Sequence, residues 1–65
     1  MRVRNEKLIN RRLEQGLTQV EVALKVNVSL RAYQKYENEG QTPNARTAVL
    51  IAKVLGTTVE KLWGL

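Results

Sequence analysis

Three hydrogen-bonding side chains, Arg31, Gln34 and Lys35, lie close together in a chain that contains neither histidine nor cysteine. A guanidinium or ammonium group can donate to O6 and N7 of guanine or to a phosphate, and a glutamine amide can pair with adenine or meet a phosphate. The missing histidine and cysteine remove the commonest general base, thiolate metal ligands and disulfides. These residue types therefore indicate binding rather than catalysis, with no metal and no small-molecule cofactor.

The charge balance points to an anionic partner. The 65 residues carry 11 Lys and Arg against 6 Asp and Glu, a net charge of +5. Such a surface serves solubility or attracts an anion, most often nucleic acid. No apolar run approaches membrane-spanning length and no signal peptide precedes the domain, so we expect no membrane partner and a cytoplasmic location. The length allows one domain, residues 1–65.

Those side chains must be positioned by short helices, because glycine and proline divide the chain into helical segments and no segment shows strand alternation. We expect an all-α bundle with helices over about residues 3–15, 19–26, 30–38, 45–55 and 59–63. Apolar spacing predicts an inner face made of Leu8, Ile9, Leu13, Leu17, Val22, Ala23, Val26, Tyr33, Tyr36, Ala45, Ala48, Ile51, Ala52, Leu55, Val59, Leu62 and Trp63. Val20, Leu24 and Leu50 are expected on exposed faces.

The connection between the second and third helices is unusually tight. Thr18 to Glu21 reads as a capping box, Asn27 can end a helix in the left-handed conformation, and Ser29 can cap the next helix. Asn44 is expected to cap the fourth helix. Two helices joined this closely cross steeply and leave the second with an outward face, which can enter a DNA major groove ~12 Å wide. An ordinary helical hairpin is the alternative.

The sequence resembles the helix-turn-helix domain of phage Cro and cI repressors and their bacterial relatives, the XRE-like regulators. The resemblance runs from about residue 8 to residue 63 and is carried by Arg12, Gly16-Leu17-Thr18-Gln19, Val22-Ala23, Val28-Ser29, Tyr33, Tyr36-Glu37, Pro43, Ala52, Leu55-Gly56 and Leu62. It implies a compact five-helix, lambda-repressor-like DNA-binding domain that is usually dimeric on DNA. Asn27 and Glu39 stand where the family often has glycine, and with Gly40 next we expect a reshaped loop.

The resemblance also implies roles for individual residues. It implies that bases are contacted by Leu30, Arg31, Gln34 and Lys35. Leu30 is expected either against a thymine methyl or packed on the preceding helix. Phosphate contacts fall to Thr18, Gln19, Ser29, Asn38 and Thr42. Arg12 and Glu37 form a structural ion pair. Further exposed basic candidates, for which a solvated face is the simpler explanation, are Arg2, Arg4, Lys7 and Arg11.

Our hypothesis is a sequence-specific regulator of double-stranded DNA, a repressor of a phage, prophage or mobile element. The resemblance implies a homodimer on a palindromic operator, joined through the end of the fourth helix, the last helix and residues 63–65. A protein-interaction module such as an antitoxin is the alternative. An enzyme fragment is disfavoured because the sequence has no phosphate loop and no carboxylate pair suited to a cleft.

Overall fold

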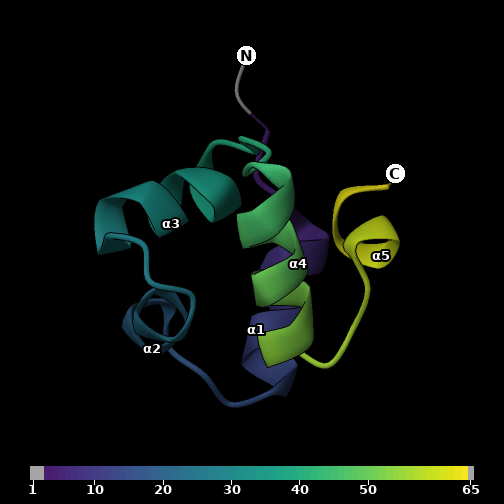
Figure 1. Cartoon of the computed structure of the whole chain (residues 1–65). Helices are drawn as coiled ribbons and strands as arrows, with labels where there is room; N and C mark the ends of the chain where they lie inside the picture. The colour runs from purple at the N-terminus through teal and green to yellow at the C-terminus, as the bar shows by residue number, and fades with distance from the viewer. Residues whose placement is uncertain (1–2, 65) are drawn as a thin grey trace.

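The computed structural model describes residues 3–64, and these residues form five α-helices and no strand (Figure 1). The helices are α1 (Glu6–Glu14), α2 (Gln19–Lys25), α3 (Leu30–Asn38), α4 (Ala45–Val54) and α5 (Val59–Trp63). The expected all-α fold and the order of its helices are therefore confirmed. No helix in residues 3–64 is both long and apolar enough to cross a membrane.

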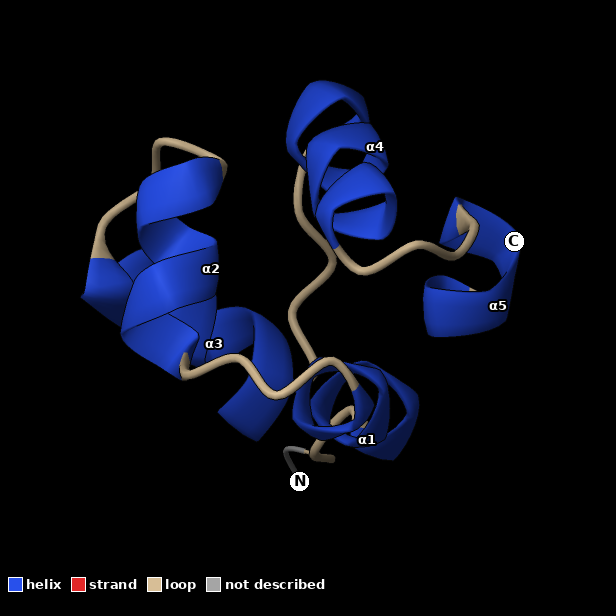
Figure 2. Cartoon of the chain, turned by 90° about the horizontal axis from the view of Figure 1, so that it is seen from below, coloured by secondary structure: helices blue, strands red, loops and turns tan. Residues whose placement is uncertain are grey.

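The helices surround a single core rather than forming layers. In Figure 1, α4 lies in front of α1 in the centre of the view, with α2 and α3 on one side and α5 on the other. The view from below in Figure 2 separates α1 from α4, which lie on opposite sides of a ring that they form with α2, α3 and α5. Because α3 packs mainly against α2 and α1, one side of it is left without a covering helix.

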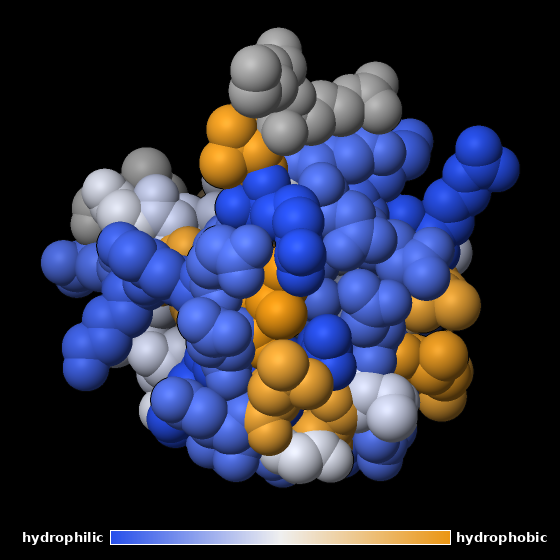
Figure 3. All heavy atoms as spheres, turned by 180° about the vertical axis from the view of Figure 1, so that it is seen from behind, coloured by the Kyte–Doolittle hydropathy of each residue, from blue (hydrophilic) through white to orange (hydrophobic). Residues whose placement is uncertain are grey.

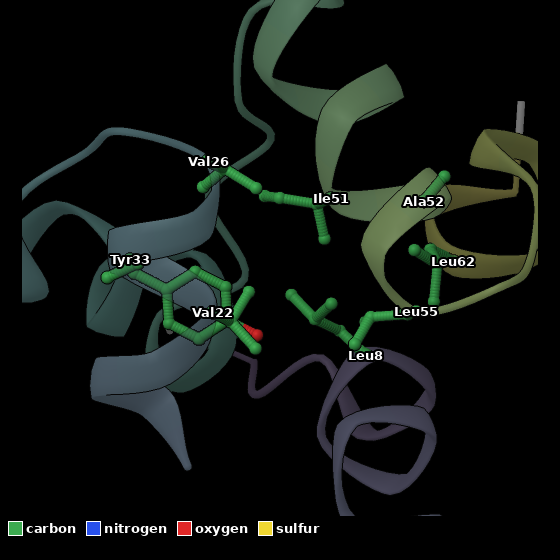
Figure 4. Close-up of a cluster of buried hydrophobic side chains, with 9 residues drawn as sticks. Leu8, Val22, Val26, Tyr33, Ile51, Ala52, Leu55 and Leu62 are labelled. Atoms are coloured by element: carbon green, nitrogen blue, oxygen red, sulfur yellow. The ribbon is translucent and has the colours of Figure 1, made fainter. Parts of the chain in front are cut away.

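Every helix contributes to the core drawn in Figure 4. Its largest fully buried apolar side chains are Tyr33, Leu8, Ile51, Leu55 and Val22, which come from α3, α1, α4, the end of α4 and α2. Burying a side chain of this size contributes about 1.5–3 kcal/mol relative to leaving it exposed. No helix in residues 3–64 is long enough to be stable alone, so the shared core holds each of them in place.

Each helix begins at a polar side chain that accepts a backbone N–H three residues further on. These caps are Asn5, Thr18, Ser29, Asn44 and Thr58. The predicted caps at Thr18, Ser29 and Asn44 are confirmed, including the Thr18–Glu21 capping box. The first helix starts later than predicted because the Asn5 side chain caps it, while the Asn5 backbone N–H donates to the Glu37 carbonyl at 2.8 Å.

Three predicted placements of apolar side chains are wrong. Leu13 was expected inside but is 59% exposed, because the buried face of α1 follows Leu8 and Arg12 and Leu13 lies beside that line. Ala45 is exposed because it is the first residue of α4, beyond the edge of the core. Leu50 was expected outside but packs against the core, and its neighbour Val49 is exposed instead.

Some exposed apolar side chains gather around one hollow, which Leu13, Val20 and Leu30 line together. Val20 and Leu24 are exposed as predicted. On the face drawn in Figure 3, hydrophilic side chains predominate and apolar ones appear in small separate groups. Isolated apolar side chains such as those on this face are common on folded proteins.

Two residues with positive φ shape the connections on either side of α3. Asn27 has φ 60°, and Val28 N–H donates to the Ala23 carbonyl at 3.0 Å, which closes the turn between α2 and α3. After α3, Gly40 has φ 66°, and a Cβ atom there would overlap the Val3 carbonyl oxygen. The left-handed residue thus stands at Gly40 rather than at Glu39, and it makes room for the chain that leads into α1.

We predict that Asn27→Ala lowers the free energy of unfolding by about 1 kcal/mol, because alanine is disfavoured at positive φ. Asn27→Gly should leave stability close to that of the wild type, since glycine adopts this conformation without strain. Asn10→Ala, the same change at an exposed position inside α1, serves as the control and should not destabilise. Urea denaturation measures all three, and an Asn27→Ala variant as stable as Asn27→Gly would contradict the prediction.

Candidate nucleic-acid interface

A buried carboxylate, Glu37 in the last turn of α3, receives hydrogen bonds from three helices. Its Oε2 accepts from Arg12 Nε at 2.6 Å and from the Tyr33 hydroxyl at 2.6 Å. Its Oε1 accepts from Arg12 Nη2 at 3.1 Å and from Gln19 Nε2 at 2.9 Å. Because a carboxylate offers about four lone-pair sites, these bonds satisfy it completely.

The charges of this cluster are held by its hydrogen bonds. Burial favours the neutral form of Glu37, but the bonds from Arg12, Tyr33 and Gln19, together with the Arg12 charge, outweigh it and lower the pKa of Glu37. The hydrogen bond to Glu37 raises the pKa of Arg12. Burial, followed by the neighbouring carboxylate, raises the pKa of Tyr33. Glu37 is therefore an ionised acceptor and Tyr33 a protonated donor at neutral pH.

The hydrogen bonds around Glu37 fix the orientation of α3 relative to α1 and α2. Arg12 and Glu37, the residues expected to form an ion pair, are in contact, with their side chains only 11% and 1% exposed. Arg12 also donates from Nη1 to the Leu17 carbonyl at 2.8 Å, in the connection between α1 and α2. One guanidinium thus joins α1, the start of α2 and the end of α3.

One side of α3 faces a hollow of about 570 Å³ that it shares with α1 and α2. Leu30 and Gln34 line it from α3, together with Gln19 and Val20 from α2 and Leu13 from α1. Gln34 Nε2 donates to Gln19 Oε1 at 3.4 Å. Leu30 is 39% exposed, so part of it remains open to a ligand.

The other side of α3 carries its cations. Arg31 and Lys35 are exposed and line a smaller hollow with Ser29 and Tyr36. Within residues 3–64, neither cation has a side-chain hydrogen bond or an ion pair. Gln41 also lines this hollow and was missed by the sequence analysis. Its backbone N–H donates to the Lys35 carbonyl at 3.3 Å, which brings the following loop back beside α3.

The residues expected at DNA phosphates fall into different settings. The Thr18 and Ser29 hydroxyls accept the backbone N–H of Glu21 and Ala32, so each has its own proton left to donate. Gln19 is turned inward toward Glu37. Asn38 and Thr42 are exposed, but Thr42 lines a separate hollow next to α5 and the start of the described chain. Thr42 is thus not brought together with the others.

The basic side chains of the first segment are not equivalent. Arg11 was expected as an exposed cation, but its Nε donates to the Leu55 carbonyl at 2.7 Å and its Nη2 to the Gly56 carbonyl at 3.1 Å. It therefore caps the end of α4, where cations satisfy free carbonyls. Arg4 lies 3.7 Å from Glu6. Lys7 is exposed, and Arg2 lies outside the described residues.

Comparison of the sequence identifies similar proteins. A family profile described as helix-turn-helix matches residues 8–62. The chain is 34% identical over 59 residues to the cryptic phage CTXphi transcriptional repressor RstR of Vibrio cholerae serotype O1. That alignment covers 91% of this chain and 53% of the relative, so the chain spans about half the length of that curated protein.

Solved structures share the fold. The N-terminal DNA binding domain of SinR from Bacillus subtilis superposes with a TM-score of 0.80 at 24% identity, covering 89% of this chain and 86% of that one. A transcriptional regulator from Listeria innocua gives a TM-score of 0.80 at 23% identity, covering 94% of this chain and 57% of that one. The five-helix arrangement is therefore shared with these proteins.

We predict that Arg12→Ala or Glu37→Ala lowers the free energy of unfolding by about 3–5 kcal/mol, because each change leaves a buried charge without its partner. Arg4→Ala, which removes an exposed arginine near Glu6, is the control and should cost less than about 1 kcal/mol. Urea denaturation at neutral pH measures these differences. If both interior variants unfold at the same urea concentration as Arg4→Ala, the buried pair does not support the fold.

Proposed function

The chain belongs to the XRE-type helix-turn-helix family, and we propose that it is a sequence-specific, double-stranded DNA-binding repressor of transcription. One observation carries the proposal most directly. The exposed side of α3 presents Arg31 and Lys35, which have no side-chain hydrogen bond or ion pair within the described chain, while Tyr33 anchors its inner side in the core. The net charge of +5 favours an anionic partner such as DNA.

In this proposal α3 lies in the major groove, which admits one helix. Arg31 pairs with O6 and N7 of guanine, Lys35 donates to a neighbouring guanine or to the backbone, and Leu30 contacts a thymine methyl. Thr18, Gln19, Ser29, Asn38 and Thr42 are proposed at phosphates, with Gln19 held by Glu37 so that only its second N–H is available. Bound at an operator, the protein blocks access of the polymerase.

We propose that two copies bind together. Helix-turn-helix dimers place their recognition helices ~34 Å apart and read half-sites about one helical turn apart, which makes the operator palindromic. The contacts are proposed at the end of α4, at α5 and at the last residues, of which Leu65 lies outside the described chain. Trp63 supports this location, because it is only half-buried at the end of α5 and leaves apolar surface that a second copy can cover.

The biological setting is also a proposal. The similar Vibrio cholerae protein is a phage transcriptional repressor, and a prophage or mobile-element operator is the corresponding target here. Repression at such an operator places the protein in the cytoplasm of a bacterial host.

We predict that selection from random duplex DNA yields a palindromic site, and that binding to it weakens steeply with salt. For ~6–8 phosphate contacts per dimer, log K should fall against log salt with a slope of roughly −5 to −7. Gel shifts over a salt series measure the slope, and light scattering of the complex measures the number of bound copies. Affinity that barely changes with salt, or a selected pool without any common sequence, would reject the proposal.

Arg31 provides a second prediction, because a base contact and a phosphate contact respond differently to substitution. Arg31→Lys keeps the charge but loses the planar fork that pairs with guanine. We expect it to cost ~1–3 kcal/mol at one operator position and to relax the preference there.

The measurement compares Arg31→Lys and Arg31→Ala on every single-base variant of the operator. Lys25→Ala, which removes an exposed cation from the last turn of α2, outside the residues proposed to contact DNA or the second copy, controls for the loss of net charge. A uniform loss of affinity, with the preference at every position unchanged, would assign Arg31 to the phosphate backbone.

A further inference from the structure

Two glutamines connect the buried carboxylate to the open hollow beside α3. Gln19 Nε2 donates to Glu37 Oε1 at 2.9 Å, and Gln34 Nε2 donates to Gln19 Oε1 at 3.4 Å. The chain of bonds thus begins at a side chain that is 1% exposed and ends at a half-buried one in the hollow lined by Leu30 and Val20. Which group donates and which accepts in each of these hydrogen bonds is determined by Glu37.

The direction follows because an ionised carboxylate can only accept hydrogen bonds. Glu37 therefore requires that Gln19 turn its NH₂ group inward, which leaves Gln19 Oε1 pointing the other way. That oxygen is also only an acceptor, so Gln34 must turn its own NH₂ group toward it. The opposite orientation of Gln19 would set two acceptor oxygens against each other at hydrogen-bond distance.

The series of hydrogen bonds from Glu37 through Gln19 ends at the side-chain carbonyl oxygen of Gln34. No protein group in residues 3–64 donates to Gln34 Oε1. Among these residues, Trp63 Nε1 is the only side-chain nitrogen or oxygen that is both buried and without a hydrogen-bond partner, so Gln34 Oε1 is not buried. Gln34 Oε1 must therefore reach solvent. Gln34 lies one helical turn after Leu30, on the same side of α3, where side chains four residues apart are neighbours.

We infer that Gln34 is a specificity-determining residue whose fixed amide presents a hydrogen-bond acceptor to the major groove. The bases that satisfy it are those with an exocyclic amine, adenine through N6 and cytosine through N4. Guanine O6 and thymine O4 are themselves acceptors, so each is disfavoured opposite Oε1 on the contacted strand, while the second N–H of Gln34 stays free to donate beside it. A phosphate oxygen is disfavoured at Oε1 for the same reason, so this oxygen reads bases and not the backbone.

This inference rests on the proposed DNA binding and adds to it a reason for the choice of base. A glutamine with no neighbour can exchange its oxygen and nitrogen by rotation and meet either a donor or an acceptor. Here the buried ion pair, which touches no DNA, removes that freedom through Gln19. Gln19 is accordingly a positioning residue, and Gln34 is the reader.

The experiment measures binding of the full chain to its selected operator and to every single-base variant of it. The proteins are the wild type, Gln34→Met, Gln19→Met and Gln15→Met. Methionine matches glutamine in length without its amide, and Gln15 is an exposed glutamine at the end of α1 that serves as the matched control. Thermal unfolding of each variant establishes that it is folded, and Glu37 retains its Arg12 and Tyr33 bonds in Gln19→Met.

We expect the wild type and Gln15→Met to favour adenine or cytosine over guanine and thymine by about tenfold at one position. Gln34→Met should lose that preference and keep all others. Gln19→Met should weaken binding to every operator variant alike, because it also removes the proposed phosphate contact of Gln19. Relative to the preferred base it should accept guanine or thymine at that position nearly as well, because Gln34 is then able to rotate. A position that depends on Gln34 yet favours guanine or thymine overturns the inference, as does an unchanged profile in Gln19→Met.

A readout without DNA separates this inference from the proposed function. In ¹⁵N–¹H spectra of the free protein, the side-chain amide signals of Gln34 should shift in Gln19→Met and stay in place in Gln15→Met. Unshifted Gln34 signals in Gln19→Met would disprove the chain of bonds whatever the protein binds. Shifted signals together with wild-type DNA binding that shows no sequence preference would instead reject the proposed function, and the base readout with it.

Discussion

The ionised carboxylate of Glu37, buried in the last turn of α3, is the constraint on which the rest of the structure depends. Removing a charge from water costs several kcal/mol, and the cost is offset only when the charge is paired and its lone pairs are satisfied. Arg12, Gln19 and Tyr33 meet that requirement from α1, α2 and α3 itself. Three helices must therefore converge on one point, and this convergence orients α3.

The same constraint makes the two exposed sides of α3 differ in how firmly their polar side chains are held. On the side that faces α2, Gln34 is tied through Gln19 to the interior, so its amide is held in one orientation. On the other side, Arg31 and Lys35 extend from the helix without a side-chain partner in residues 3–64. A surface of this kind combines a preorganised contact, which loses little entropy on binding, with cations that can adapt to the backbone or to a base.

The 11 Lys and Arg of the sequence overstate the number of cations that are available to a partner. Arg12 forms an ion pair with Glu37, and Arg11 donates hydrogen bonds to the carbonyl groups of Leu55 and Gly56 at the end of α4. A fold of this size has a small core and marginal stability, so hydrogen bonds and ion pairs between distant segments contribute a larger share of its stability. Two of the basic residues therefore serve the architecture rather than the interface.

Local features of this protein were determined by the sequence alone. The caps at Thr18, Ser29 and Asn44 and the left-handed Asn27 depend on atoms within a few residues, so composition and spacing sufficed to predict them. The outward placement of Arg31 and Lys35 likewise follows from the helical period and from the apolar side chain of Tyr33 between them.

Only the tertiary structure decided which polar side chains are occupied by the protein itself. Arg11 reaches a carbonyl group 44 residues away, and Gln19 reaches a carboxylate 18 residues away. It also decided that Leu13 and Ala45 lie outside while Leu50 packs inward, because helical period shows which residues share a face but not how far the neighbouring helices cover it. Such contacts depend on how the helices are placed in space, and that placement is set by packing between segments that are distant in the chain.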